Sequence, residues 1–202
     1  MKKLHLIIAG LAAGLLADVS AGIAAPKTMR FFDQNTKSWV IYAPRASRNI
    51  GAAAANPVPR EVVAYEGPHG ANTIIVDTSE RRLYFVVGDG TAIKYGVGVG
   101  REGFEWTGTN RISRKAEWPG WTPPPAMRKR RPELPAYMEG GPSTPLGARA
   151  MYLGSTLYRI HGSNEPQTIG QAVSSGCIRM ANEDVTHLYD LAQVGTKVIV
   201  QN

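Results

Sequence analysis

Short β-branched runs alternate with tight turns from residue 71 onward, and this alternation limits the fold more than any other feature. Leu83, Phe85 and Val87 share one face of a strand-like run, and Gly88 and Gly90 form the turn after it. The expected strands are Thr73–Asp77, Arg82–Val87, Ala92–Val99, Ala148–Leu153, Leu157–His161 and Thr196–Val200. The 22 glycines and 14 prolines argue against a helical bundle. We therefore expect a mainly β fold, an antiparallel β-sandwich.

One short helix is expected after Met180. Asn182 is a suitable N-cap, and the acidic Glu183 and Asp184 suit the positive end of the helix dipole. The expected buried stripe consists of Val185, Leu188, Tyr189 and Ala192. By this count His187 lies on the exposed side of the helix.

The segment 105–145 is expected to be a long irregular loop, rich in proline and tryptophan. It contains three tryptophans, a run of prolines at 123–125 and a basic cluster at 128–131. Long loops inside compact domains are often lids or binding loops. We expect a lid or a wall of a substrate groove, with the basic cluster facing carboxylates. A solvated structural insertion is the alternative.

The reactive groups lie in one stretch around the single cysteine. Cys177 directly follows Gly176, and His161 lies upstream at the end of an expected strand. A thiol needs a base to become a thiolate near neutral pH, and histidine is the usual base. Glycine allows a sharp turn, and N–H groups around Gly176, next to Ser175, are expected to face an oxyanion. The group that orients His161 is left open among a backbone carbonyl, Ser163 and Ser175.

The first 25 residues have the pattern of a secretory signal peptide. Lys2 and Lys3 form a basic start, an apolar run follows at 4–17, and small residues continue to Ala25. Residues 26–70 are expected to be a linker or N-terminal arm, and residues 71–202 one folded domain. An exported chain with one cysteine cannot form a disulfide within itself. That cysteine is therefore either a free reactive thiol or an intermolecular link.

The formal net charge of +7 bears on the partners. A basic exported protein suits polyanionic surroundings such as a cell wall or a membrane surface, although moderate positive charge also simply aids solubility. Nucleic acid is not an expected partner, because export separates the chain from it and no recognition motif occurs. Membrane contact is expected only through the leader during export. Histidine and cysteine do not cluster at ligand spacing, so we expect no metal and no cofactor.

The motif SSGCIRM at 174–180, with HG at 161–162, resembles the signature of the L,D-transpeptidase catalytic domain (YkuD-like, of the ErfK/YbiS/YcfS/YnhG type). GGPSTPLGARAMYL at 140–153 also resembles the segment that precedes the catalytic histidine in that family. The resemblance covers about residues 71–200. Family members often carry a histidine two residues before the cysteine, where this chain has Ser175. The base that matches the family pattern is His161.

The resemblance implies a sandwich of the L,D-transpeptidase type and acyl transfer on peptidoglycan in the periplasm. Cys177 would be the nucleophile that forms a thioester with a stem tetrapeptide, and His161 the general acid and base. Such enzymes release D-Ala and pass the acyl group to another stem peptide, to a lysine of an outer-membrane lipoprotein, or to a free D-amino acid. They need no metal, and carbapenems typically acylate the same cysteine.

Arg179, Gly162 and Ser163 are expected to contact the substrate, and a structural ion pair is the alternative role for Arg179. Other functions stay open. A cysteine peptidase or amidase, such as a carboxypeptidase on the same wall peptides, would pass the acyl group to water. A non-catalytic wall-binding protein is the second alternative, and a redox or intermolecular-disulfide role is the third.

Overall fold

The computed structural model describes residues 29–33, 38–42 and 56–202, and the chain divides into two units, Met1–Arg48 and Asn49–Asn202. In the first unit, β1 (Met29–Asp33) pairs antiparallel with β2 (Ser38–Tyr42). The expected leader lies outside the described residues. No helix in the described ranges has both the length and the apolar character needed to cross a membrane.

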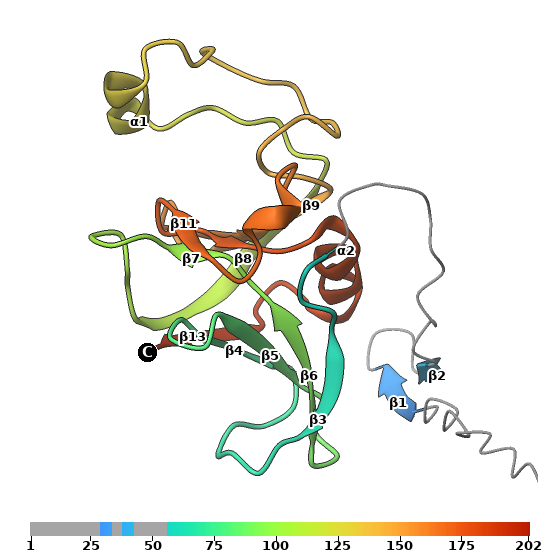
Figure 1. Ribbon diagram of the computed structural model, residues 1–202. Coiled ribbons are helices and arrows are strands. Elements are labelled where there is room, and N and C mark those ends of the chain that lie inside the picture. The colour runs from blue at the N-terminus through green and yellow to red at the C-terminus, as the bar shows by residue number, and fades with distance from the viewer. Residues whose placement is uncertain (1–28, 34–37, 43–55) are drawn as a thin grey trace, which may run out of the picture. The chain divides into compact units, whose positions relative to one another are not determined.

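Strands dominate the second unit (Figure 1). They are β3 (Glu61–Ala64), β4 (Thr73–Asp77), β5 (Arg82–Val86), β6 (Thr91–Gly96), β7 (Val99–Gly100), β8 (Gly108–Glu117), β9 (Arg149–Leu153), β10 (Arg159–His161), β11 (Ala172–Ser174), β12 (Ile178–Arg179) and β13 (Lys197–Gln201). The helical segments are α1 (Pro125–Arg130), a 3₁₀ turn (Pro166–Thr168) and α2 (Asn182–Leu191). The mainly β fold with a short helix after the cysteine is therefore confirmed.

Among the described residues, one nine-stranded sheet has the order β12-β10-β9-β8-β13-β4-β5-β6-β3. Most neighbours are antiparallel, as expected, but β13 runs parallel to β4 and β10 runs parallel to β12. A second small sheet pairs β7 with β11, also in parallel. Strand β3 lies within the segment 26–70 that was expected to be a linker or arm, and it pairs with β6 at the edge of the large sheet.

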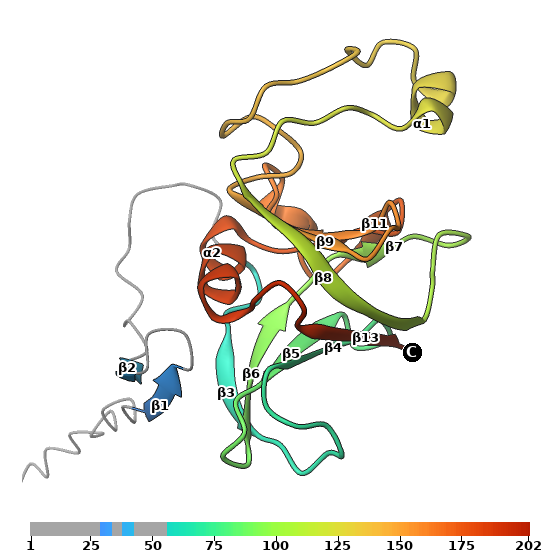
Figure 2. The same cartoon turned by 180° about the vertical axis from the view of Figure 1, so that it is seen from behind.

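The ten-residue strand β8 connects the two halves of the sandwich. Its residues 108–111 pair with β13, and its residues 112–117 pair with β9, with a register shift after Ile112. Figure 2 shows β8 passing from β13 to β9, so that one sheet folds over a common core. The expectation that 105–145 is irregular throughout was wrong, because β8 and α1 lie inside it.

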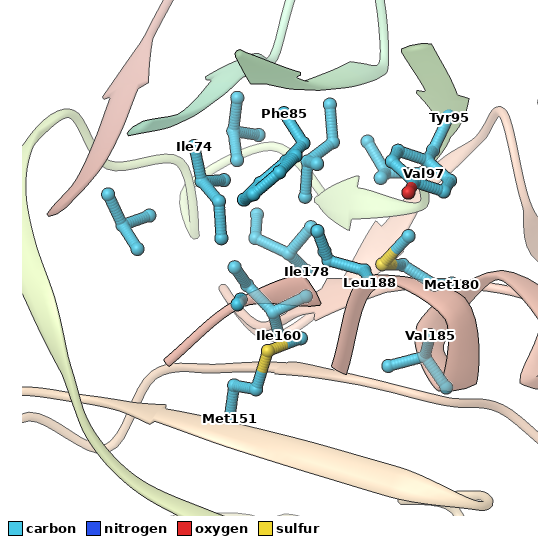
Figure 3. Close-up of a cluster of buried hydrophobic side chains, with 14 of the residues drawn as sticks. Ile74, Phe85, Tyr95, Val97, Met151, Ile160, Ile178, Met180, Val185 and Leu188 are labelled. Carbon is cyan, nitrogen blue, oxygen red and sulfur yellow. The ribbon is translucent and has the colours of Figure 1, made fainter. Parts of the chain in front are cut away.

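The core contains side chains from both halves of the sheet and from α2 (Figure 3). Ile74 and Phe85 come from β4 and β5, and Ile160 and Ile178 come from β10 and β12. All four are at most 4% exposed. Burial of such side chains is worth about 1.5–3 kcal/mol each, so the core holds the strands that carry the reactive segment.

Helix α2 buries most of the expected stripe, since Val185 and Leu188 are fully buried and Ala192, just after the helix, is 1% exposed. Tyr189, the fourth expected member, is only partly buried against the core. The expected capping by Asn182 was wrong. The N-cap is Ala181, which makes no side-chain capping bond. The Asn182 Oδ1 instead accepts a hydrogen bond of 2.8 Å from the Ala148 N–H, which joins the start of α2 to the chain just before β9.

His187 is not on an exposed helix face, which corrects a second expectation. Its Nδ1 lies 2.7 Å from the Tyr95 hydroxyl, and its side chain is partly buried. Burial lowers the pKa of His187 to about 4, and the positive charge of Arg60 acts in the same direction. Segment 56–64 packs in this region and therefore changes the environment of one side of the helix.

Asp184 joins this segment to α2 through a buried carboxylate. It is 1% exposed, and its Oδ1 lies 2.7 Å from the Arg60 Nη1. The Asn56 Nδ2 donates a hydrogen bond of 2.6 Å to the other carboxylate oxygen. Burial raises the pKa of Asp184, while the bonds and charge of Arg60 oppose this rise. A buried charge held by two side chains fixes the residues before β3 against the helix.

Candidate active site

The reactive segment is built on the parallel pair β10 and β12. Ile160 pairs with Ile178, and His161 pairs with Arg179. Side chains alternate between the two faces of a strand. Because Ile160 and Ile178 enter the core, His161 and Arg179 belong to the opposite face.

Cys177 immediately precedes β12, two residues before Arg179, and alternation places it on the same face. The Arg159 Nη1 lies 4.0 Å from the Cys177 Sγ, which supports this placement. The thiol is partly exposed and also lies 3.8 Å from the carbonyl oxygen of Leu157. Two neighbouring strands therefore bring the predicted nucleophile, the predicted base and two arginines to one face.

His161 is held as a neutral imidazole. It is 4% exposed, and its Nδ1 lies 2.5 Å from the carbonyl oxygen of Gly162. A carbonyl only accepts, so this contact assigns the proton to Nδ1 and leaves the lone pair on Nε2. Burial lowers the pKa of His161 to about 3; the Gly162 carbonyl opposes this effect, and the charges of Arg179 and Arg159 add to it. Of the three orienting groups left open, a backbone carbonyl makes the contact.

A tight turn before the cysteine is organised by Ser174. The Gly176 N–H donates to the Ser174 Oγ at 3.1 Å, and that hydroxyl donates to the Cys177 carbonyl oxygen at 2.6 Å. Gly176 has a φ of +100°, a conformation that L side chains rarely adopt. The expected sharp turn is present. The Gly176 N–H, expected to face an oxyanion, is bound to Ser174 here.

Trp106 contacts this turn from the other side, and sequence reasoning gave it no specific contact. Its Nε1 donates a hydrogen bond of 2.7 Å to the Gly176 carbonyl oxygen. Its ring stacks on Tyr158, with centroids 4.4 Å apart and planes 3° from parallel. A Cβ on Gly176 would lie 2.5 Å from the Tyr158 ring. Glycine is therefore required by both its φ and its surroundings.

The remaining predicted site residues have internal partners. The Ser175 Oγ accepts a hydrogen bond of 3.0 Å from the Arg101 Nη1. Ser163 is 2% exposed, and its Oγ accepts from the Glu165 N–H at 3.0 Å. The Arg179 Nη1 lies 2.9 Å from the Glu165 Oε2, so an ion pair occupies the side chain of Arg179. Gly162 supplies the carbonyl that orients His161.

A pocket of about 260 Å³ lies beside the reactive turn. It is lined by Thr78, Ser79, Arg81, Val99, Gly100, Glu105, Trp106, Ala172, Ile178 and Asn202. The lining includes Trp106 and Ile178 but neither Cys177 nor His161, so the reacting atoms lie outside this pocket. Within the described ranges, no three His, Cys, Asp or Glu side chains are grouped closely enough to hold a metal ion.

Proteins named as L,D-transpeptidases are similar in sequence to this chain. The probable L,D-transpeptidase ErfK/SrfK of Escherichia coli is 42% identical over 134 residues. That match covers 62% of this chain and 42% of the relative, so this chain spans less than half of the relative's length.

Solved structures share the fold. An L,D-transpeptidase from Mycobacterium smegmatis aligns with a TM-score of 0.53 and 19% identity, over 64% of this chain and 58% of that one. A Brucella melitensis structure, titled a probable carnitine operon oxidoreductase CaiA, is 42% identical with a TM-score of 0.50. It aligns over 73% of this chain and 96% of that chain.

The family model of the L,D-transpeptidase catalytic domain (YkuD) matches residues 71–200. That stretch includes every strand from β4 to β12, helix α2 and both reactive residues. This chain belongs to the YkuD family of L,D-transpeptidase catalytic domains.

Proposed function

We propose that this protein is a peptidoglycan L,D-transpeptidase that works through a thioester on Cys177. The sulfur attacks the carbonyl of the diaminopimelate–D-Ala bond in a stem tetrapeptide, and the His161 Nε2 takes the thiol proton. The tetrahedral intermediate collapses, the C–N bond breaks, and His161 returns the proton to the departing amine of D-Ala. An acceptor amine then attacks the thioester and gives its proton to the His161 Nε2, the C–S bond breaks, and Cys177 leaves as a thiolate that His161 can protonate again.

The observation that carries this proposal is the face shared by Cys177 and His161 on β10 and β12. The pairing of Ile160 with Ile178 sets the two reactive residues on adjacent strands over one core. The hydrogen bond at Nδ1 keeps Nε2 as the atom able to accept a proton. A buried, neutral histidine and a partly exposed thiol on the same face suit a base that acts during attack.

The Cys177 N–H is our candidate for the donor to the oxyanion. In a trans peptide the N–H points opposite to the preceding carbonyl, and no described peptide bond is cis. The Trp106 indole holds the Gly176 carbonyl oxygen, so it also fixes the direction of the Cys177 N–H. One such donor has been worth about 2.7–4 kcal/mol of transition-state stabilisation in other enzymes.

The substrate, the acceptor and the location are proposals that rest on the family. We propose that the donor is a stem tetrapeptide in the periplasm, reached through the leader at 1–25. The acceptor amine belongs to a second stem peptide, to a lipoprotein lysine or to a free D-amino acid. The positive net charge of +7 suits a polymer that carries carboxylates.

Purified diaminopimelate-containing muropeptides test the proposal when the products are read by mass. We expect loss of D-Ala and a cross-linked dimer with the parent chain, and neither with Cys177→Ala. The Thr109→Ala variant, changed on an exposed residue of β8, is a matched control that should keep both products. Loss of D-Ala without a dimer, even with an added D-amino acid, would favour a carboxypeptidase. No reaction, with Cys177 still labelled by a thiol reagent, would overturn the tetrapeptide donor.

A further inference from the structure

A row of side chains crosses the face of the sheet and ends at the nucleophile. Arg114 on β8 pairs with Tyr152 on β9, and Tyr152 pairs with Arg159 on β10. The Arg114 guanidinium lies 3.6 Å from the centre of the Tyr152 ring, and the Arg159 guanidinium lies 5.3 Å from it. Because the Arg159 Nη1 is 4.0 Å from the Cys177 Sγ, the ring holds this guanidinium beside the sulfur.

Arg159 has no carboxylate partner among the described residues. Its Nε is buried without a hydrogen-bond partner in the same part of the chain. A buried polar group without a partner is unfavourable, and neither an internal ion pair nor a hydrogen-bond network explains this placement. The sulfur of Cys177 is the polar atom that the guanidinium does contact.

The other charged groups around the thiol are already engaged. Arg179, from β12, is paired with Glu165 at 2.9 Å. Arg101, from the segment after β7, donates to the Ser174 carbonyl oxygen and the Ser175 hydroxyl. His161, from β10, is neutral, because burial lowers its pKa to about 3. Arg159 is therefore the cation near the sulfur that still lacks an anion in the described structure.

We propose that Arg159 is a further catalytic residue, whose guanidinium is the counter-charge of the Cys177 thiolate. This role rests on the proposed thioester mechanism. When the S–H bond breaks, the proton moves to the His161 Nε2, the electron pair stays on sulfur, and Arg159 remains protonated. A positive charge about 4–6 Å from an ionising group favours its anionic form. The same charge faces the sulfur again when the thiolate leaves the thioester.

Alkylation of the single thiol by iodoacetamide measures this effect without any peptide substrate. We expect Arg159→Gln to slow alkylation near pH 7 by about tenfold. The Arg159→Lys variant, which keeps the charge, should recover most of the rate. The matched control is Arg114→Gln, which removes a cation from the same row on the far side of Tyr152 and should leave the alkylation rate unchanged.

Unmodified protein gives a second measurement in case Arg159→Gln does not fold, which urea unfolding will reveal. Raising the salt to about 1 M shortens the screening length to about 3 Å, so alkylation of the parent chain near pH 7 should slow. An unchanged alkylation rate near pH 7 in folded Arg159→Gln, or no salt effect where that variant fails to fold, overturns the proposal. An unchanged alkylation rate with a higher KM for muropeptides would instead assign Arg159 to a substrate carboxylate. Alkylation is independent of transpeptidation, so failure of this inference and failure of the proposed function are distinguishable.

Discussion

The space around Gly176 is too small for a residue with a side chain. Its φ of +100° is unfavourable for L side chains, and an added Cβ would lie 2.5 Å from a ring carbon of Tyr158. The same residue positions the peptide bond that leads into Cys177. A change here should therefore affect both stability and the geometry of the nucleophile.

We expect Gly176→Ala to lower the free energy of unfolding by about 1–3 kcal/mol and to slow transpeptidation by about a hundredfold. Urea unfolding and the muropeptide assay measure the two effects. Gly90→Ala is the matched control, because Gly90 also has a positive φ, +82°, but open space around it. It should lose stability through backbone strain alone and keep its activity. Equal activity in both variants would contradict this account of the turn.

His161 should make stability depend on pH. Burial lowers its pKa in the folded state to about 3, from 6.5 for an ordinary histidine. Between these values the unfolded chain binds one more proton than the native protein. The neutral histidine therefore makes its full contribution to the free energy of unfolding above about pH 6.5. That contribution is lost as the pH falls, by up to about 1.4 kcal/mol per pH unit.

The His161→Gln variant isolates this contribution, because glutamine does not titrate. We expect the stability difference between the parent chain and His161→Gln, measured by urea unfolding, to fall as the pH is lowered from 7 toward about 4.5. His187, whose burial lowers its pKa to about 4, is present in both chains and cancels in the difference. A difference that stays constant over this range would show that His161 is not buried in its neutral form.

Individual residues differ in how far the sequence could predict them. Cys177 and His161 could be proposed as a reactive pair because a thiol after glycine and an upstream base form a local pattern. Arg159 was not assigned a role, because its position beside the sulfur depends on the register of β10 and β12. Trp106 and Gly176 are 70 residues apart, and no local pattern joins them.

Strand β8 could not be predicted from its local sequence either. Of its ten residues only Ile112 is buried, so the alternation of apolar and polar residues that predicts a strand is absent. Its structure comes from pairing with β13 on one side and β9 on the other. The strands with a clear pattern, the β-branched run of β4 and the apolar alternation of β5, were predicted within one residue of their ends.

Ile112 should be the anchor of β8, since it is 1% exposed and lies where the strand changes partners. We expect Ile112→Ala to lower the free energy of unfolding by about 2–5 kcal/mol, because it leaves a cavity in the core. Thr109→Ala, on an exposed residue of the same strand, should change it by less than about 0.5 kcal/mol. Urea unfolding compares the two, and similar costs would show that β8 is held by backbone pairing alone.

At the scale of the molecule, the folded unit extends beyond the segment matched by the family model. Residues 56–64 contribute β3 and the partners of the buried Asp184. The sequence predicted only a linker or arm here. The ion pair between Arg60 and Asp184 joins residues 124 positions apart, so no local sequence pattern could indicate it. Residues 56–64 therefore contribute to the stability of the domain, although they lie far from Cys177 and His161 in the sequence.

We expect Arg60→Met to lower the free energy of unfolding by about 3 kcal/mol, because it leaves a buried carboxylate without its cation. Adding Asp184→Asn should recover part of this loss, since it removes the buried charge. The control is Lys94→Met, which breaks the exposed ion pair between Lys94 and Glu61 and should cost less than about 1 kcal/mol. If the double variant is no more stable than Arg60→Met in urea, the charge pair does not explain the loss.

Strand β13 lies between β8 and β4, and it is the link through which the two halves of the large sheet are hydrogen-bonded. Its residues, Lys197–Gln201, leave the ribosome after every other strand described here. Until they are made, no strand pairing within the large sheet joins β8, β9, β10 and β12 to β3–β6. Closure of the sandwich is therefore coupled to the synthesis of Lys197–Gln201, which follow all the other described strands. In a nascent chain stopped before residue 197, we expect the two halves of the large sheet to stay unpaired and the core to be exposed to solvent.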